Sequence, residues 1–306
     1  MADKKIVLAG GTGNIGDLLS SVLVQLDYEV IILSRKLHTS KHSNIKYIRW
    51  DGETVGEWKE ALEDADTLIN LSGNSIQCRF TERNKKELLS SRIDPTRILG
   101  EAIDEVKNPP RLWINFSGIS IFEGLEGMHD EESKDCGNTF LANLTKQWEN
   151  SFFSARTPNT AKVCLRLSPV LSRDFGMFKE LYPLAKLGLG GKVGDGNQKV
   201  CWIHEDDLVK LVLWIINHES PSDLYHACSS APESNKLFMK NLRKAVGMPL
   251  GMPLPTLFAK IGAYFKGVES DMLLRTNSVY AIRPAKEGFE YNYPTTQKAF
   301  EHLTKK

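Results

Sequence analysis

The feature that most constrains this chain is a glycine-rich turn near its amino end. Gly10-Gly11-Thr12-Gly13-Asn14-Ile15-Gly16 follows the apolar run Lys5 to Ala9 and opens the amphipathic stretch Asn14 to Leu26. Glycine at these spacings permits a tight turn, lets main-chain N–H groups approach a diphosphate and lets a helix pack closely on a strand. The positive end of the helix then faces the diphosphate. We therefore expect a dinucleotide site with contacts from Gly10, Thr12, Gly13, Asn14, Ile15 and Gly16.

The end of the next apolar run indicates which dinucleotide is bound. A site for NAD usually has a carboxylate here for the ribose 2′-hydroxyl, whereas a basic residue accommodates the 2′-phosphate of NADP. This chain has Ser34, Arg35 and Lys36 at that point and no acid. The pattern predicts NADP(H) as cofactor, the alternative being a solvated basic turn.

Short apolar runs alternate with longer amphipathic stretches through the first two thirds of the chain. Such alternation predicts an α/β fold, a Rossmann-type doubly wound parallel sheet with helices on both faces. The expected strands are Lys5 to Ala9, Glu29 to Leu33, Asn44 to Arg49, Thr67 to Leu71, Leu112 to Ser117 and Lys162 to Leu167, and the expected helices are Asn14 to Leu26, Glu53 to Glu63, Thr81 to Val106 and Thr139 to Ala155.

After about residue 172 the sequence becomes richer in glycine and proline. We expect residues 1–172 to form the NADP-binding Rossmann domain, with 200–228 returning to it. Residues 173–199 and 229–306 are expected to form a small C-terminal substrate lobe, with helices at Thr256 to Phe265 and Thr295 to Leu303.

Charge and cysteine content exclude several classes of partner. The 39 Lys and Arg residues nearly balance 38 Asp and Glu, which leaves a formal charge of +1 and no basic field for nucleic acid. No apolar run approaches the roughly 20 residues that span a bilayer, so we expect no membrane partner. Five cysteines without CxxC spacing favour reduced thiols, hence a cytoplasmic protein without a metal site.

Several landmarks together resemble the extended short-chain dehydrogenase/reductases, within them an atypical epimerase subgroup similar to nucleoside-diphosphate-sugar epimerases. The likeness covers nearly the whole chain and implies the same fold with a C-terminal lobe over a substrate cleft. The landmarks are Gly10 to Gly16, Leu33-Ser34-Arg35, Asn70-Leu71-Ser72-Gly73, Arg79 to Thr81, Ser91 to Ile93, Gly188 to Gly191, Trp202 to His204, Asp207-Leu208, Gly288 to Tyr291 and Tyr293-Pro294.

The resemblance implies further cofactor contacts. Ser34 and Arg35 should meet the adenosine phosphate end, and Leu71, Ser72 and Gly73 should line the cofactor after the fourth strand. The positions of Glu87, Arg92 and Val170 match other contacts of the subgroup, although Glu87 also fits an exposed helix face. Asp51 fits either a contact to the adenine amino group or a simple turn.

The usual catalytic pair of this superfamily is absent from its expected place. A Tyr-x-x-x-Lys pair on the helix after the fifth strand normally trades a proton with a substrate hydroxyl. That helix here offers Phe140-Leu141-Ala142-Asn143-Leu144, and we interpret the one such spacing, Tyr182 to Lys186, as a coincidence. The usual catalytic serine aligns with Gly118, so Ser117 and Ser120 remain as candidate hydrogen-bond donors to a substrate carbonyl.

Other polar clusters have plainer interpretations. The run His129 to Glu132 fits an acidic turn better than a metal cluster. His204 is expected to be structural, next to a helix capped by Asp206 or Asp207. Cys136 has no nearby base in the sequence and is not expected to be a nucleophile.

Three hypotheses on function follow. The first is an NADP(H)-binding short-chain dehydrogenase/reductase-like protein, an oxidoreductase or epimerase acting on an unknown small carbonyl, hydroxyl or nucleotide-sugar substrate. The alternative is a non-catalytic NADP(H)-responsive binding or regulatory protein, which the missing Tyr and Lys favour. The third is a scaffold that no longer binds nucleotide.

Overall fold

The computed structural model describes residues 4–40, 42–258, 269, 276 and 278–305. A seven-stranded parallel sheet with the order β10-β6-β5-β4-β1-β2-β3 forms its centre. The chain thus starts in the middle of the sheet and builds outward in both directions, which confirms the doubly wound α/β fold. The strands are β1 (Lys5–Ala9), β2 (Glu29–Ser34), β3 (Ile45–Arg49), β4 (Thr67–Asn70), β5 (Leu112–Gly118), β6 (Ala161–Leu167) and β10 (Leu224–Ala227).

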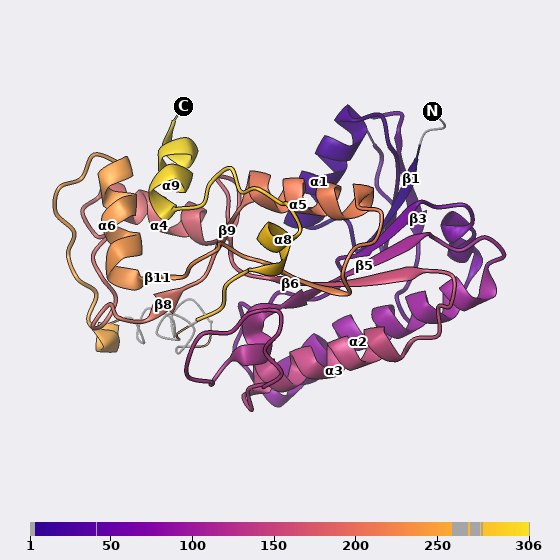
Figure 1. The fold of residues 1–306 in the computed structure, drawn as a ribbon, viewed down its shortest axis with the longest axis horizontal. Coiled ribbons are helices and arrows are strands. Elements are labelled where there is room, and N and C mark those ends of the chain that lie inside the picture. Colours follow the sequence, from indigo (N-terminus) through magenta and orange to yellow (C-terminus); the bar gives the residue numbers. More distant parts are fainter. Residues whose placement is uncertain (1–3, 41, 259–268, 270–275, 277, 306) are drawn as a thin grey trace.

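Both faces of the sheet are covered (Figure 1), because alternate residues of each buried strand point to opposite sides. In β1, Ile6 and Leu8 pack toward α1 and α5, whereas Val7 and Ala9 pack toward the opposite helices. The helices of the first face are α1 (Asn14–Gln25) and α5 (Glu205–Asn217), and those of the second are η1 (Glu57–Leu62), α2 (Glu82–Glu105) and α3 (Phe140–Ser154).

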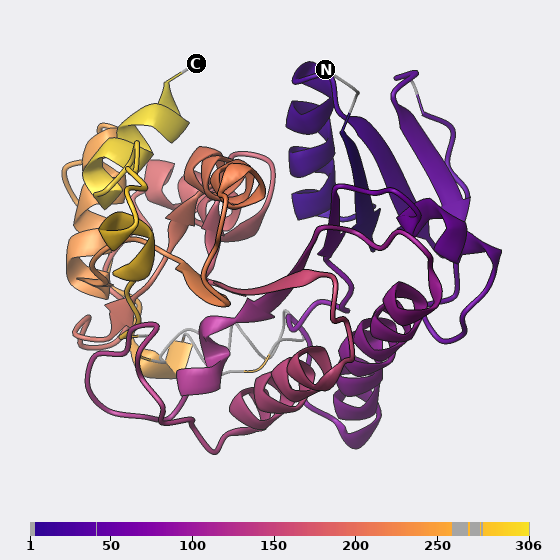
Figure 2. The ribbon, with the colours of Figure 1, turned by 45° about the vertical axis from the view of Figure 1, so that its right-hand side comes forward.

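A separate apolar core lies beside the sheet, at the left of Figure 2. Phe178, Phe238 and Phe300 bring three helices together there. The elements of this region are β7 (Val170–Leu171), α4 (Gly176–Lys186), β8 (Lys199–Val200), β9 (Ile203–His204), β11 (Glu233–Ser234), α6 (Asn235–Ala245) and α9 (Thr296–Thr304). Two short helices lie elsewhere: α8 (Arg283–Lys286) contacts β10, and η2 (Ile119–Phe122), which follows β5, contacts α3. Since β10 pairs with β6, residues 224–227 lie in the central sheet, while the division into two domains stays a prediction.

Local structure departs from the sequence pattern in two places. The predicted helix Glu53 to Glu63 is only the short 3-10 helix η1, because the Asp51 carboxylate accepts the N–H groups of Glu53 and Thr54 and holds the preceding residues in a turn. The stretch Val200 to Ile203, which is strand-like in sequence, is not one strand but divides into β8 and β9, which join different small sheets. Residues 259–265 of the predicted helix Thr256 to Phe265 lie outside the described residues.

Among the helices of the described chain, none has both the length and the apolar character that crossing a bilayer requires.

Candidate functional site

The glycine turn lies at the carboxyl end of β1, and each glycine has a separate physical reason. Gly10 has φ +70°, and a Cβ on it would lie 2.9 Å from Ser72 Cα. A Cβ on Gly16 would lie 2.2 Å from the Gly11 carbonyl oxygen, so only glycine allows the first turn of α1 to approach the backbone of the preceding turn this closely. A Cβ on Gly13, the N-cap of α1, would meet nothing within 4 Å. The turn therefore opens to free space at the amino end of α1, where a diphosphate binds in dinucleotide folds.

The end of β2 presents two cations beside this turn. Ser34 is buried, and its hydroxyl accepts the Lys36 N–H at 3.2 Å, which folds the chain back after the strand. Arg35 and Lys36 are exposed. Their side chains are thus available to a phosphate at the edge where β1 and β2 end.

The buried side-chain amide of Asn70 holds the loop after β4 in place. Asn70 Oδ1 accepts the Ser72 N–H at 3.0 Å, and its Nδ2 donates to Asn115 Oδ1 at 2.7 Å and Thr96 Oγ1 at 3.0 Å. Trp148 Nε1 donates to the same threonine oxygen at 3.0 Å. This network joins β4, β5, α2 and α3, and fixes the position of Leu71, Ser72 and Gly73 beside the glycine turn.

Arg92 lies under that loop. It is 8% exposed and donates to the carbonyls of Leu88 and Asn74, while its guanidinium stacks 5.3 Å from the Trp148 ring centre. A Cβ on Gly73 would lie 3.2 Å from Arg92 Cζ, so the loop rests on the guanidinium. Burial lowers the pKa of Arg92 to about 10, which leaves it charged at neutral pH.

The remaining predicted cofactor residues occupy varied positions. Hydrogen bonds, the largest from the Thr54 hydroxyl, lower the pKa of the exposed Asp51 carboxyl to about 2, and they close a turn after β3. Glu87 is exposed on α2 and pairs with Arg83 at 2.8 Å. Val170 is buried in β7. Asp51 and Glu87 therefore have partners within the chain, and contact of these three residues with a cofactor stays a prediction.

At the end of β5, the first candidate serine points inward. Ser117 is buried, and its hydroxyl donates to Glu149 Oε1 at 2.6 Å. Arg166 donates to both oxygens of the same carboxylate, from Nε at 2.9 Å and from Nη2 at 2.8 Å. Burial opposes the charge of Arg166, but the hydrogen bonds and charge of Glu149 outweigh it and raise the pKa of the guanidinium. Ser117 thus belongs to an internal ion-pair cluster.

Sequence reasoning missed this cluster. A signal was present, because Arg166 interrupts the apolar strand Val163 to Leu167, and a charge in a buried strand requires a partner. Which acid supplies it depends on the packing of α3 against the sheet.

The second candidate, Ser120, is half-buried at the start of η2. Its hydroxyl lies 2.8 Å from Thr145 Oγ1, on α3. Thr145 in turn donates to the Leu141 carbonyl at 2.8 Å. The spacing Tyr182 to Lys186 lies in α4, where the Lys186 ammonium sits over the Tyr182 ring, 5.1 Å from its centre. Since α4 packs in the separate core, these two residues belong to that region.

His204 caps α5, where the sequence suggested Asp206 or Asp207. Its Nδ1 accepts the Asp206 N–H at 3.0 Å, so its proton is on Nε2, 3.2 Å from His302 Nδ1. His204, Asp206 and His302 have the composition of a metal site, with ligand atoms within 4.8 Å of one another. A metal on His204 Nε2 requires Nδ1 to carry the proton and so to lose the cap, and we therefore explain the cluster by its hydrogen bonds.

The acidic turn after η2 contains one buried carboxylate. Glu131 accepts N–H groups from His226 at 3.1 Å, Ile282 at 3.0 Å and Arg283 at 3.3 Å. Burial raises the pKa of Glu131 despite these bonds. The turn thus ties the loop after β5 to the chain near α8.

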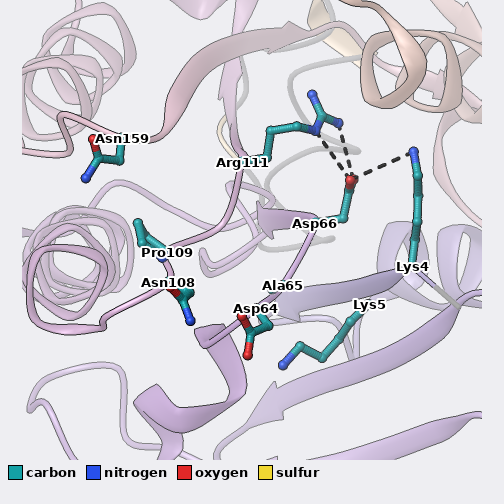
Figure 3. A pocket seen from close by; sticks show the side chains of 9 residues that line it. All are labelled: Lys4, Lys5, Asp64, Ala65, Asp66, Asn108, Pro109, Arg111 and Asn159. Carbon is teal, nitrogen blue, oxygen red and sulfur yellow. Dashed lines mark hydrogen bonds and ion pairs between the residues drawn. The ribbon is translucent and has the colours of Figure 1, made fainter. Parts of the chain in front are cut away.

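A hollow of about 530 Å³ lies at the opposite edge of the sheet, around residues that precede the strands (Figure 3). Asp66 there pairs with Arg111 at 3.2 Å and with Lys4 at 3.8 Å. The two cations thus share one carboxylate, and the hollow shares no residue with the glycine turn or the ends of β4 and β5.

Comparison with known proteins agrees with this architecture. Residues 6–146 match the model of the NAD dependent epimerase/dehydratase family. An epimerase family protein of Staphylococcus saprophyticus is 32% identical over 98% of this chain and 99% of its own. The crystal structure of human epimerase family protein SDR39U1 with NADPH has a TM-score of 0.86 and 29% identity, and the match covers 98% of this chain and 99% of the human one.

More distant structures share the fold alone. UDP-N-acetylglucosamine 4-epimerase from Bacillus cereus, at 17% identity, has a TM-score of 0.75 over 99% of this chain and 98% of its own. From the glycine turn, the strand order and the full-length similarity together, the chain belongs to the epimerase family.

Proposed function

We propose that this protein binds NADP(H) across the carboxyl edge of the sheet and acts as a short-chain dehydrogenase/reductase-like oxidoreductase or epimerase. The observation that carries the proposal is the glycine turn, which opens to free space at the amino end of α1 with Arg35 exposed at the end of the neighbouring strand. The human relative crystallised with NADPH supports the choice of cofactor. When bound, NADP(H) would supply the hydride chemistry.

The residues of this chain would then bind and orient the cofactor. The main-chain N–H groups of Gly13 to Ile15 would meet the diphosphate, and Arg35 with Lys36 would meet the 2′-phosphate. Leu71, Ser72 and Gly73 would line the cofactor on the other side of the turn, with Arg92 holding that loop and adding positive charge. We propose the cytoplasm as the location, for which the five free cysteines are the support.

Calorimetry with NADPH and NADH tests this assignment. A charge-assisted hydrogen bond contributes about 1.5 to 3 kcal/mol, so Arg35→Ala should weaken NADPH about tenfold to a hundredfold and leave NADH nearly unchanged. The matched control is Arg156→Ala, an exposed arginine just after α3. Equal losses of affinity for the two cofactors would contradict the contact between Arg35 and the 2′-phosphate. If the wild-type protein bound neither cofactor, the proposal would be wrong.

A second candidate function is a non-catalytic NADP(H)-responsive protein. The inward-pointing Ser117 favours it, since that hydroxyl is committed to Glu149. In this case NADPH should raise the melting temperature without being consumed when carbonyl compounds and sugar nucleotides are added. Oxidation of NADPH in step with product formation would eliminate this second candidate.

A further inference from the structure

Ser120 lies against Gly118, the position that the resemblance matches to the usual catalytic serine of such folds. That serine aligns with Gly118, and a Cβ built on Gly118 would lie 3.0 Å from Ser120 Oγ. A larger side chain at 118 would displace the Ser120 hydroxyl, so the two positions compete for one space. The glycine therefore lets Ser120 place a hydroxyl at the carboxyl end of β5.

The direction of this hydroxyl follows from counting hydrogens. Thr145 has one hydroxyl hydrogen, and the Leu141 carbonyl oxygen, 2.8 Å away, is an acceptor only. Because Thr145 donates this hydrogen to the carbonyl, Thr145 Oγ1 can only accept from Ser120 Oγ, which lies 2.8 Å away. The hydrogen between the two hydroxyl oxygens therefore belongs to Ser120. Both hydroxyl hydrogens are satisfied in this arrangement, whereas the reverse direction leaves the Ser120 hydrogen without a partner in the pair.

We infer that Ser120 presents an acceptor oxygen to the ligand at this edge, and that the ligand group it meets is a hydroxyl. The inference deepens the proposed function, on which it rests for the presence of a ligand beside the dinucleotide. A ligand hydroxyl would extend the chain from ligand to Ser120, Thr145 and the Leu141 carbonyl, with every hydrogen used. A carbonyl oxygen at the same point would face a lone pair of Ser120 Oγ and could not form a hydrogen bond with it.

The same chain of hydrogen bonds gives Ser120 a positioning role. It ends at the Leu141 carbonyl, which accepts a hydrogen bond but does not take up a proton at neutral pH. Ser117 provides no second path, because its hydrogen is on Glu149. Ser120 therefore selects the alcohol member of an alcohol and carbonyl pair by binding, and the reaction proton passes elsewhere.

Neutron diffraction on deuterium-exchanged crystals of the ligand-free protein tests the direction. The deuteron between Ser120 and Thr145 should be bonded to Ser120 Oγ and point at Thr145 Oγ1. A deuteron bonded to Thr145, or one on Ser120 that points away from Thr145, overturns the inference. This result does not depend on cofactor binding, so it remains decisive if NADP(H) fails to bind and the proposed function fails.

Ligand-observed NMR tests the selectivity with two matched probes, 1-indanol and 1-indanone, on the protein saturated with NADP⁺. An unpaired polar group costs enough that 1-indanol should bind at least about tenfold more tightly. Thr145→Val frees the Ser120 hydrogen and should reduce this ratio or invert it, while Thr145→Ser, which keeps the acceptor, should preserve it. Equal affinities in the wild type, absence of binding by both probes, or the same ratio in Thr145→Val all overturn the selectivity.

Discussion

Two buried histidines should make the fold sensitive to mild acid. Burial lowers the pKa of His204 to about 4 and that of His226 to about 3, from an ordinary value of 6.5. Both side chains have no exposed surface. Between about pH 6.5 and about pH 4 the unfolded chain binds protons at these two positions and the folded chain does not, so stability falls as the pH falls.

The size of the loss follows from the same values. Between about pH 7 and about pH 5, each histidine removes about 2 kcal/mol from the free energy of unfolding, or about 4 kcal/mol for the pair. This is a large share of the roughly 5 to 15 kcal/mol that stabilises an ordinary domain. Glu131 and Asp207, whose pKa values are raised by burial, bind protons more readily in the folded chain and offset part of the loss.

Variants isolate the histidine contribution from that of the carboxylates. His226→Gln keeps a donor for the Tyr280 carbonyl, and His204→Asn keeps a side-chain acceptor for the cap of α5. Urea unfolding at a series of pH values should show that each variant loses about 2 kcal/mol less than the wild type between about pH 7 and about pH 5, with additive effects in the double variant. A pH dependence unchanged in both single variants would refute the reasoning.

Three further predictions concern the carboxyl edge. Gly16→Ala puts a Cβ 2.2 Å from a backbone oxygen and should lower the free energy of unfolding in urea by about 3 kcal/mol or more. Gly13→Ala should stay within about 1 kcal/mol of the wild type in the same assay and lose NADPH affinity in calorimetry. Similar stabilities of the two variants would contradict the packing argument. Glu149→Leu leaves the Arg166 guanidinium without its carboxylate and should cost about 3 to 5 kcal/mol, most of which the double variant with Arg166→Leu should recover; a double variant as unstable as the single would refute this. Arg92→Met should keep or raise the stability of the ligand-free protein and weaken NADPH at least about tenfold, and undiminished NADPH affinity in this variant would be the contrary result. Arg92→Lys should not restore binding, because a lysine ammonium lacks the planar guanidinium that stacks on the Trp148 ring.

Local patterns predicted the fold well because they reflect local causes. The steric need for glycine at positions 10 and 16 acts over a few residues, and the alternation of apolar runs fixes strands and helices. The short helix η1 shows the limit of such patterns, since the Asp51 turn removes the first residues from a stretch that has helical spacing. Propensity there is overridden by a side-chain hydrogen bond.

The candidate site depends more on distant pairs, which the sequence does not order. The hydrogen of Ser120 is directed by Thr145, 25 positions along the chain, and Ser117 by Glu149, 32 positions along. Which residues of α3 face the end of β5 depends on the rotation of that helix against the sheet. Sequence reasoning could name both serines as candidates, but only the packing shows that Ser117 points inward to Glu149 and that Ser120 meets Thr145.

Arg92 shows how the site and the stability of the fold are connected. The fall of its pKa from 12.5 to about 10 corresponds to about 3 kcal/mol lost by the charged form on burial. The partners that the structure describes for it are two carbonyls, an indole ring and the nearby Cys78 thiol, none of which carries a full negative charge at neutral pH, since burial raises the pKa of that thiol. A diphosphate above the Ser72–Asn74 loop would supply that charge. Burial of the Arg92 charge thus destabilises the ligand-free fold, and a bound dinucleotide would offset this loss. An apolar residue at position 92 would remove both the destabilisation and the attraction to the diphosphate.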